Sequence, residues 1–155
     1  MSRLEDLVRD FKGIDQPHAH DFYMVMYVEE GSGSHTIDLK TYSIAPNQLY
    51  FLTPGQVHNW KFETQPDGYI INFSNSYFSS FLLANDYLKR FVFFSGRPDS
   101  QVMELPKAIQ DKITTLFEEI LIEGINDKLT GDDLVKTTLL RLFIEISRFQ
   151  TLSNP

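Results

Sequence analysis

Three of the chain's four histidines lie in two short strings, Pro17-His18-Ala19-His20 and Pro54-Gly55-Gln56-Val57-His58. Neutral imidazole donates and accepts hydrogen bonds at once, and it is a frequent ligand of zinc, nickel, iron and copper ions. If the fold brings these side chains together, three roles are open. They hold a metal ion, they contact a ligand in a pocket, or they bond to backbone groups and are structural.

The elements that position these strings are short strands. From Asp15 to about Leu105, apolar and aromatic runs alternate with turn residues such as Gly31-Ser32-Gly33-Ser34. The strand after the first string is mostly apolar on both faces, with Met24 on one and Tyr27 on the other. This pattern predicts a barrel wall, with the interior on one side and packed helices or a partner subunit on the other.

Composition limits the size and the class of the protein. The chain has 155 residues, enough for one domain, and no Cys for disulfides or thiolate metal sites. Its net charge of −7 excludes the usual electrostatic basis of nucleic-acid affinity for these residues alone. No apolar stretch approaches the length that spans a membrane, and the charged first residues do not resemble a signal peptide. We therefore expect a cytoplasmic protein with no membrane partner.

After Pro106 the pattern changes to two long helical segments, joined near Gly124. An apolar stripe in the second segment follows the alternating spacing of four and three that is typical of a helix–helix interface. We expect an antiparallel helix pair that covers the barrel and mediates dimerisation through this stripe. The alternative is that the stripe is buried within one chain. The stripe consists of Val135, Leu139, Leu142, Ile146 and Phe149.

The histidine strings resemble the two motifs of the cupin barrels. His-x-His opens one strand, and Pro-Gly-x-x-His opens another. In metal-binding cupins the first motif also supplies a Glu four or five residues later, but Met24 or Val25 stands at that place here. The resemblance implies a cupin fold, the double-stranded β-helix or jelly-roll barrel, with His18, His20 and His58 as the ligands if a metal is bound. The missing carboxylate favours a site without a metal or other cofactor.

A fuller likeness covers roughly residues 15 to 150. The runs 17–23, 27–38 and 52–60 resemble the N-terminal regulatory domain of AraC-type transcription regulators. The resemblance implies a homodimeric domain that senses a small organic effector and is followed by a C-terminal DNA-binding domain, which is absent from this chain. The expected organisation is mainly β with a C-terminal α part. It comprises an N-terminal arm (1–14), a cupin barrel (15–105), a helical dimerisation segment (106–150) and the start of a linker (151–155).

The expected function is therefore ligand binding, with a sugar among the possible effectors, and not catalysis. Trp60 offers a stacking face for a sugar or an aromatic ring, and His35 is expected at the surface after a tight hairpin. Two alternatives remain open: a small metal-dependent cupin oxygenase or isomerase, and a stand-alone sugar-binding cupin. The candidate ligand-binding residues are His18, His20, Phe22, Met24, His58, Trp60 and Tyr69.

Overall fold

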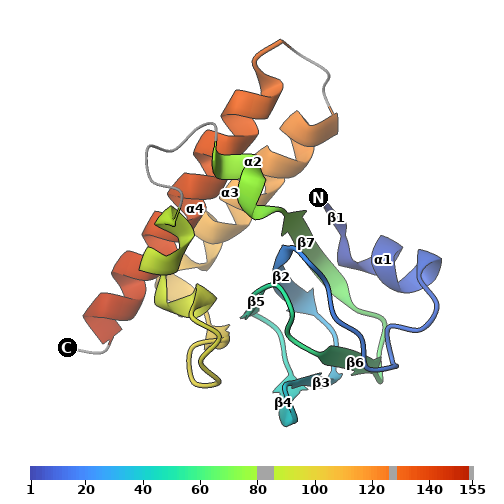
Figure 1. The fold of residues 1–155 in the computed structure, drawn as a ribbon. Helices are drawn as coiled ribbons and strands as arrows, with labels where there is room; N and C mark the ends of the chain where they lie inside the picture. Colours follow the sequence, from blue (N-terminus) through green and yellow to red (C-terminus); the bar gives the residue numbers. More distant parts are fainter. Residues whose placement is uncertain (80–85, 126–128, 154–155) are drawn as a thin grey trace.

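Antiparallel strands in two sheets form the body of the molecule, and two long helices lie against one of the sheets (Figure 1). The computed structural model describes residues 1–79, 86–125 and 129–153. The strands are β1 (Ser2–Arg3), β2 (Tyr23–Glu30), β3 (Gly33–Ile37), β4 (Lys40–Ile44), β5 (Gln48–Leu52), β6 (His58–Phe62), β7 (Asp67–Phe73) and β8 (Val102–Glu104). The helices are α1 (Leu4–Asp10), α2 (Asn75–Ser79), the 3₁₀ turns η1 (Tyr87–Arg90) and η2 (Val92–Phe94), α3 (Lys107–Ile125) and α4 (Gly131–Ser153).

The larger sheet has the strand order β1-β7-β2-β5-β8, and the smaller sheet has the order β4-β3-β6. All strand pairs are antiparallel. The predicted fold class, a mainly β barrel of the cupin type followed by an antiparallel helix pair, is confirmed. Part of the predicted connection between the helices, residues 126–128, lies outside the described residues, as do the final two residues of the expected linker.

Strand β2 is buried on both faces, as its sequence predicts. Met24 and Met26 belong to a cluster that fills the barrel interior around Trp60. Val25 and Tyr27 belong to a second cluster, which joins the outer face of the larger sheet to α3 and α4. The strand therefore separates the barrel interior from the sheet–helix interface.

The apolar stripe of α4 faces this second cluster. Leu139, Leu142 and Ile146 are at most 1% exposed within a single chain, and Phe143 beside them lies 5.6 Å from the ring of Phe73 in β7. This corrects the prediction that the stripe forms a dimer interface, because its central residues are already covered by the chain's own sheet and by α3. The two end residues of the stripe, Val135 and Phe149, are half-buried.

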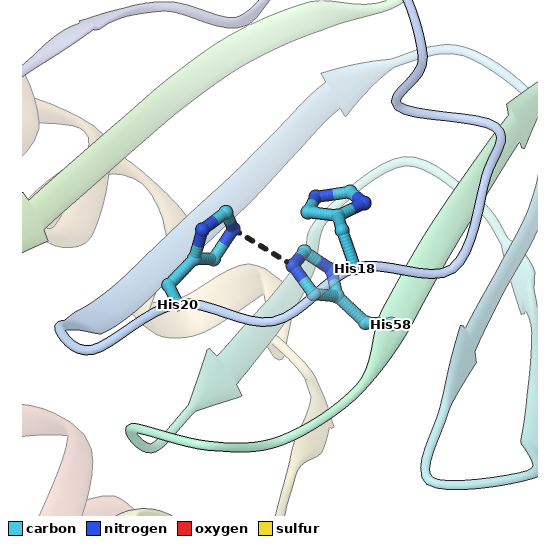
Figure 2. A group of neighbouring side chains, drawn as sticks. All are labelled: His18, His20 and His58. Atoms are coloured by element: carbon cyan, nitrogen blue, oxygen red, sulfur yellow. Dashed lines mark hydrogen bonds between the residues drawn. The ribbon is translucent and has the colours of Figure 1, made fainter.

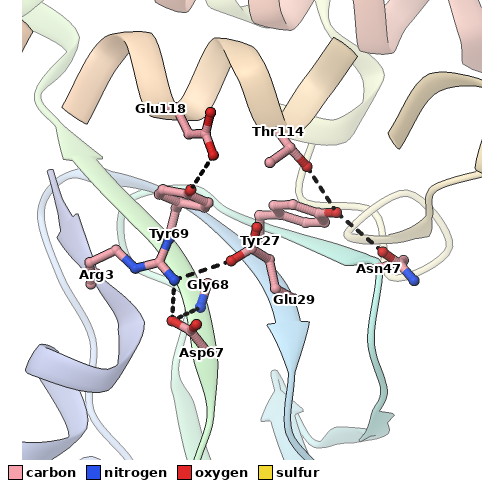
Figure 3. A network of polar contacts seen from close by, with 9 residues as sticks. All are labelled: Arg3, Tyr27, Glu29, Asn47, Asp67, Gly68, Tyr69, Thr114 and Glu118. Carbon is pink, nitrogen blue, oxygen red and sulfur yellow. Dashed lines mark hydrogen bonds and ion pairs between the residues drawn. The ribbon is translucent and has the colours of Figure 1, made fainter. Parts of the chain in front are cut away.

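The first residues of the chain are attached to the larger sheet. β1 pairs with β7, and Leu4 is fully buried in the interior cluster. Figure 3 shows the Arg3 guanidinium paired with Asp67 and, at 3.2 Å, with Glu29. The same guanidinium lies 4.3 Å from the centroid of the Tyr69 ring.

The hairpin between β3 and β4 places two non-glycine residues in the left-handed region, with φ of 46° at Asp38 and 72° at Leu39. Leu39 is 99% exposed, so no packing compensates for its backbone conformation. Leu39→Gly is expected to raise the free energy of unfolding by about 1 kcal/mol, because glycine adopts positive φ without a Cβ clash. Urea denaturation measures this change. Leu39→Ala, which keeps the Cβ, should give no gain, and an equal gain from both variants would show that the backbone is not strained there.

Candidate ligand site at the barrel mouth

Backbone pairing brings the two histidine strings together. The amide of His18 donates to the carbonyl of His58 at 3.0 Å, and the amide of His58 donates to the carbonyl of His18 at 2.8 Å. The amide of Gly55 donates to the carbonyl of His20 at 2.8 Å. The first string thus runs along the start of β6 and the loop before it, which brings the two strings into one site.

Figure 2 shows the three imidazoles of His18, His20 and His58 facing one another. One ring nitrogen from each lies within 4.8 Å of the others, and the Nε2 atoms of His20 and His58 are 3.0 Å apart. Nδ1 of His18 is 2.8 Å from the carbonyl oxygen of Gln16, which fixes Nδ1 as the protonated nitrogen and leaves Nε2 free to accept a hydrogen bond or to bind a metal. His18 and His20 are half-buried, whereas His58 is 1% exposed.

The fourth histidine lies directly behind this group. His35 is 0% exposed, and its Nε2 is 3.2 Å from Nδ1 of His58. The indole Nε1–H of Trp60 donates to Nδ1 of His58 at 3.0 Å and also contacts Nε2 of His35. The prediction that His35 lies at the surface is therefore wrong. The alternation of β3 carries the missed signal, because His35 shares a strand face with the apolar Ile37 and pairs with Trp60 on β6.

Burial keeps the imidazoles neutral. Burial, with a smaller contribution from His18 and His20, lowers the pKa of His58 to about 3. Burial also holds the pKa of His35 well below its ordinary value, and the same cause lowers the pKa of His20. At neutral pH His20, His35 and His58 are thus uncharged, and such rings accept hydrogen bonds or bind metal ions, which protonated imidazoles cannot do.

A carboxylate braces the loop that carries His58. The side chain of Asp38 accepts hydrogen bonds from Nε2 of Gln56 at 2.8 Å and from the amide of Val57 at 3.1 Å. The amide of Asp38 donates to the carbonyl of Val57 at 2.9 Å. The strained β3–β4 turn thus sets the position of the second histidine string.

The remaining candidate residues are not all at this site. The ring of Phe22 is half-buried and stacks on His20 at 4.4 Å, so it belongs to the mouth. Met24 and Trp60, 3% and 2% exposed, point into the packed interior, and Trp60 therefore presents no open stacking face. Tyr69 lies in the other cluster, stacked on Phe117 of α3. The structure does not bring Tyr69 to the histidines, which corrects its place among the ligand-binding candidates.

Within the described part of the chain, His18, His20 and His58 form the one group of potential metal ligands, and no carboxylate joins them. Met24, at the place of the cupin carboxylate, packs in the apolar interior. The site brings together three imidazole nitrogen atoms from two half-buried residues and one buried residue, a donor set suited to a hydrogen-bonded organic ligand or to a metal with open positions.

A family model described as AraC-like ligand binding domain matches residues 12–143, and the chain belongs to this family. No curated protein matches the chain.

Among solved structures, KdgF from Halomonas sp. matches with 19% identity and a TM-score of 0.32 over 37% of this chain and 53% of that one. The chain thus spans about half of its length. Oxalate decarboxylase from Bacillus subtilis matches with 14% identity and a TM-score of 0.30, over 63% of this chain and 32% of that one. Among the described residues, no helix combines the length and the apolar character needed to span a membrane.

Proposed function

We propose that this domain senses a small organic effector at the mouth formed by His18, His20, His58 and Phe22, and that it controls a C-terminal DNA-binding domain outside this chain. The observation that carries the proposal is the convergence of three imidazoles, two of them on half-buried residues, in a chain of the AraC-like ligand binding family. Imidazole nitrogens that donate and accept suit a hydroxylated or carboxylated ligand, including a sugar.

Strand β2 could transmit a change at the histidine site to the helices, because its two faces pack against the barrel interior and against the helices. Strand β2 contributes Met24 and Met26 to the interior and Val25 and Tyr27 to the interface with α3 and α4. An effector shifts a regulator only through different affinities for two arrangements. A displacement of β2 would alter the packing of Tyr27 against Phe117 of α3, at 5.5 Å between ring centroids.

Dimerisation through the helix pair is part of the proposal, but through different residues from the predicted stripe. Large apolar side chains are exposed where α3 ends and α4 begins, with exposed fractions from 47% to 103%. An exposed apolar patch marks an interaction site, and a two-fold dimer buries the same patch of both subunits. The patch consists of Ile122, Ile125, Leu129 and Leu134.

The test of effector binding is a thermal-shift screen with pentoses, hexoses and aromatic acids. A ligand at about 100 times its Kd stabilises the native state by about 2.7 kcal/mol, which raises Tm by about 8 °C for a domain of this size. His20→Ala should abolish the shift, because His20 is a half-buried residue of the mouth. Val57→Ala, at a 48% exposed position in the same loop, is the matched control and should keep it. A shift that survives in His20→Ala would remove the mouth from the proposal.

The second candidate function is a metal-dependent cupin enzyme, favoured by the geometry of the three histidine nitrogens. Its residues would be His18, His20 and His58, and a bound metal would supply Lewis acidity at its open positions. Elemental analysis separates the two functions. One equivalent of zinc, nickel, iron or copper that withstands dialysis would favour the enzyme, and a metal-free protein that still shows the ligand shift would favour the sensor.

A further inference from the structure

A concave site lies away from the histidines. A cleft of about 620 Å³ separates the end of β7 and helix α2 from the connected ends of α3 and α4. Its apolar wall includes Ile71 and Phe73 of β7, Ile120 of α3, and Val135 and Leu139 of α4. This volume is within the range of small-molecule sites, about 300–1,000 Å³.

The charged side chains on this cleft are acidic. Glu123 and Asp132 contribute to its lining, as does Met1, which carries the N-terminal amino group, and no Lys, Arg or His side chain lines it among the described residues. The carboxylate of Asp132 is already engaged, at 2.8 Å from Nζ of Lys136 and at 3.0 Å from the hydroxyl of Tyr77, which donates to it. Glu123 is half-buried, and among the described residues it has no hydrogen-bond or ion-pair partner. It is thus the carboxylate available to a ligand.

Lys136 shows how this region accommodates an ammonium group. Its Nζ pairs with Asp132 and lies 4.8 Å from the centroid of the Tyr77 ring. A carboxylate together with an aromatic face stabilises a cation more than either does alone. Space for a further group exists beside Glu123, because a Cβ added at Gly124 would meet no atom within 4 Å.

We propose that this cleft binds an organic monocation, with one ammonium group against Glu123 and an apolar body against Ile71, Ile120 and Leu139. The ligand class follows from the carboxylate of Glu123, the one in the cleft lining that has no partner among the described residues, together with the apolar wall, since a buried ammonium requires a counter-charge and its hydrocarbon part requires apolar contact. Such a ligand would contact β7, α3 and α4 together, at the same end of the helix pair as the exposed patch of Ile122 and Leu134.

The test uses three probes with the same eight-carbon chain, octylammonium, octanoate and 1-octanol, at monomeric concentrations. Titrations followed by backbone amide NMR should show saturable binding of octylammonium, with shifts in β7, α3 and α4 but not in β3 or β6. Octanoate should bind at least about tenfold more weakly, since its charge has the sign of Glu123. Equal binding of the three probes, or shifts centred on β3 and β6, would overturn the proposal.

Variants that change the charge at Glu123 test whether the ligand's ammonium group binds there. Glu123→Gln should weaken octylammonium binding about tenfold, and Glu123→Lys should transfer the preference to octanoate. Glu119→Gln, one turn earlier on α3 and exposed, is the matched control and should leave binding unchanged. Unchanged binding in Glu123→Gln would contradict the assignment. His20→Ala should not affect this site, so failure of the effector site and failure of the cleft are distinguishable.

Discussion

Leu142→Ala is expected to lower the free energy of unfolding by about 3 kcal/mol, since removing a fully buried leucine loses its transfer free energy and leaves a cavity. Leu142 is 0% exposed in the cluster that joins α4 to α3 and the larger sheet. Three aromatic rings, Phe73, Phe117 and Phe143, belong to the same cluster and limit collapse of the cavity. Urea denaturation measures this loss, and the dependence of the unfolding free energy on urea concentration should stay unchanged.

Leu134→Glu is the matched variant on the same helix. Leu134 is 47% exposed and lies in the first turn of α4, where a carboxylate is tolerated beside the helix N-terminus. We expect its unfolding free energy to change by less than about 0.5 kcal/mol, and the mass from light scattering to fall to that of a monomer. If Leu142→Ala instead gave stable monomers and Leu134→Glu an unchanged dimer, the stripe of α4 would be the subunit interface after all.

These two leucines show what the helical pattern can and cannot predict. The spacing of Leu139, Leu142 and Ile146 correctly predicts one face of a helix that is buried. It does not identify the surface that this face packs against. The same spacing allows packing against a helix of another subunit or against the outer face of the chain's own sheet. Only the tertiary arrangement, in which Phe143 and Phe73 meet at 5.6 Å, decides between them.

The site was predictable where local sequence defines it. His18, His20 and His58 flank turns at the starts of strands, so their convergence follows from the motifs. The glycines before His35 predict an exposed hairpin, and this is why its burial is not expected. Alternation along the strand gives the opposite and correct indication, because His35 lies on the same face as the apolar Ile37. The misplacement of Tyr69 has a different reason. Strand β7 is buried on both faces, with Ile70 in the interior cluster and Tyr69 in the sheet–helix cluster, so apolar alternation does not indicate which face points into the barrel.

Acidification from pH 7.5 to pH 5.5 is expected to destabilise the fold by about 3 kcal/mol. The pKa of His58 is lowered from 6.5 in the unfolded chain to about 3 in the fold. Below pH 6.5 the unfolded chain therefore binds a proton that the native state excludes. Each such histidine lowers the free energy of unfolding by about 1.4 kcal/mol per pH unit as the pH falls from 6.5 toward the pKa of the native state. Burial shifts the pKa of His35 in the same direction, so the two buried histidines contribute most, and the half-buried His20, whose pKa burial also lowers, adds to the loss.

His35→Leu separates these contributions, because it removes one titrating group while keeping an apolar side chain between Tyr50 and Trp60. Between pH 7.5 and pH 5.5 we expect the free energy of unfolding of the variant to fall by about half as much as that of the original chain, whatever its stability at pH 7.5. The interval lies above the ordinary range of Asp and Glu, so carboxylates contribute little to the difference. Urea midpoints at pH 7.5, 6.5 and 5.5 give both slopes, and equal slopes for the two proteins would mean that His35 is not held neutral by burial.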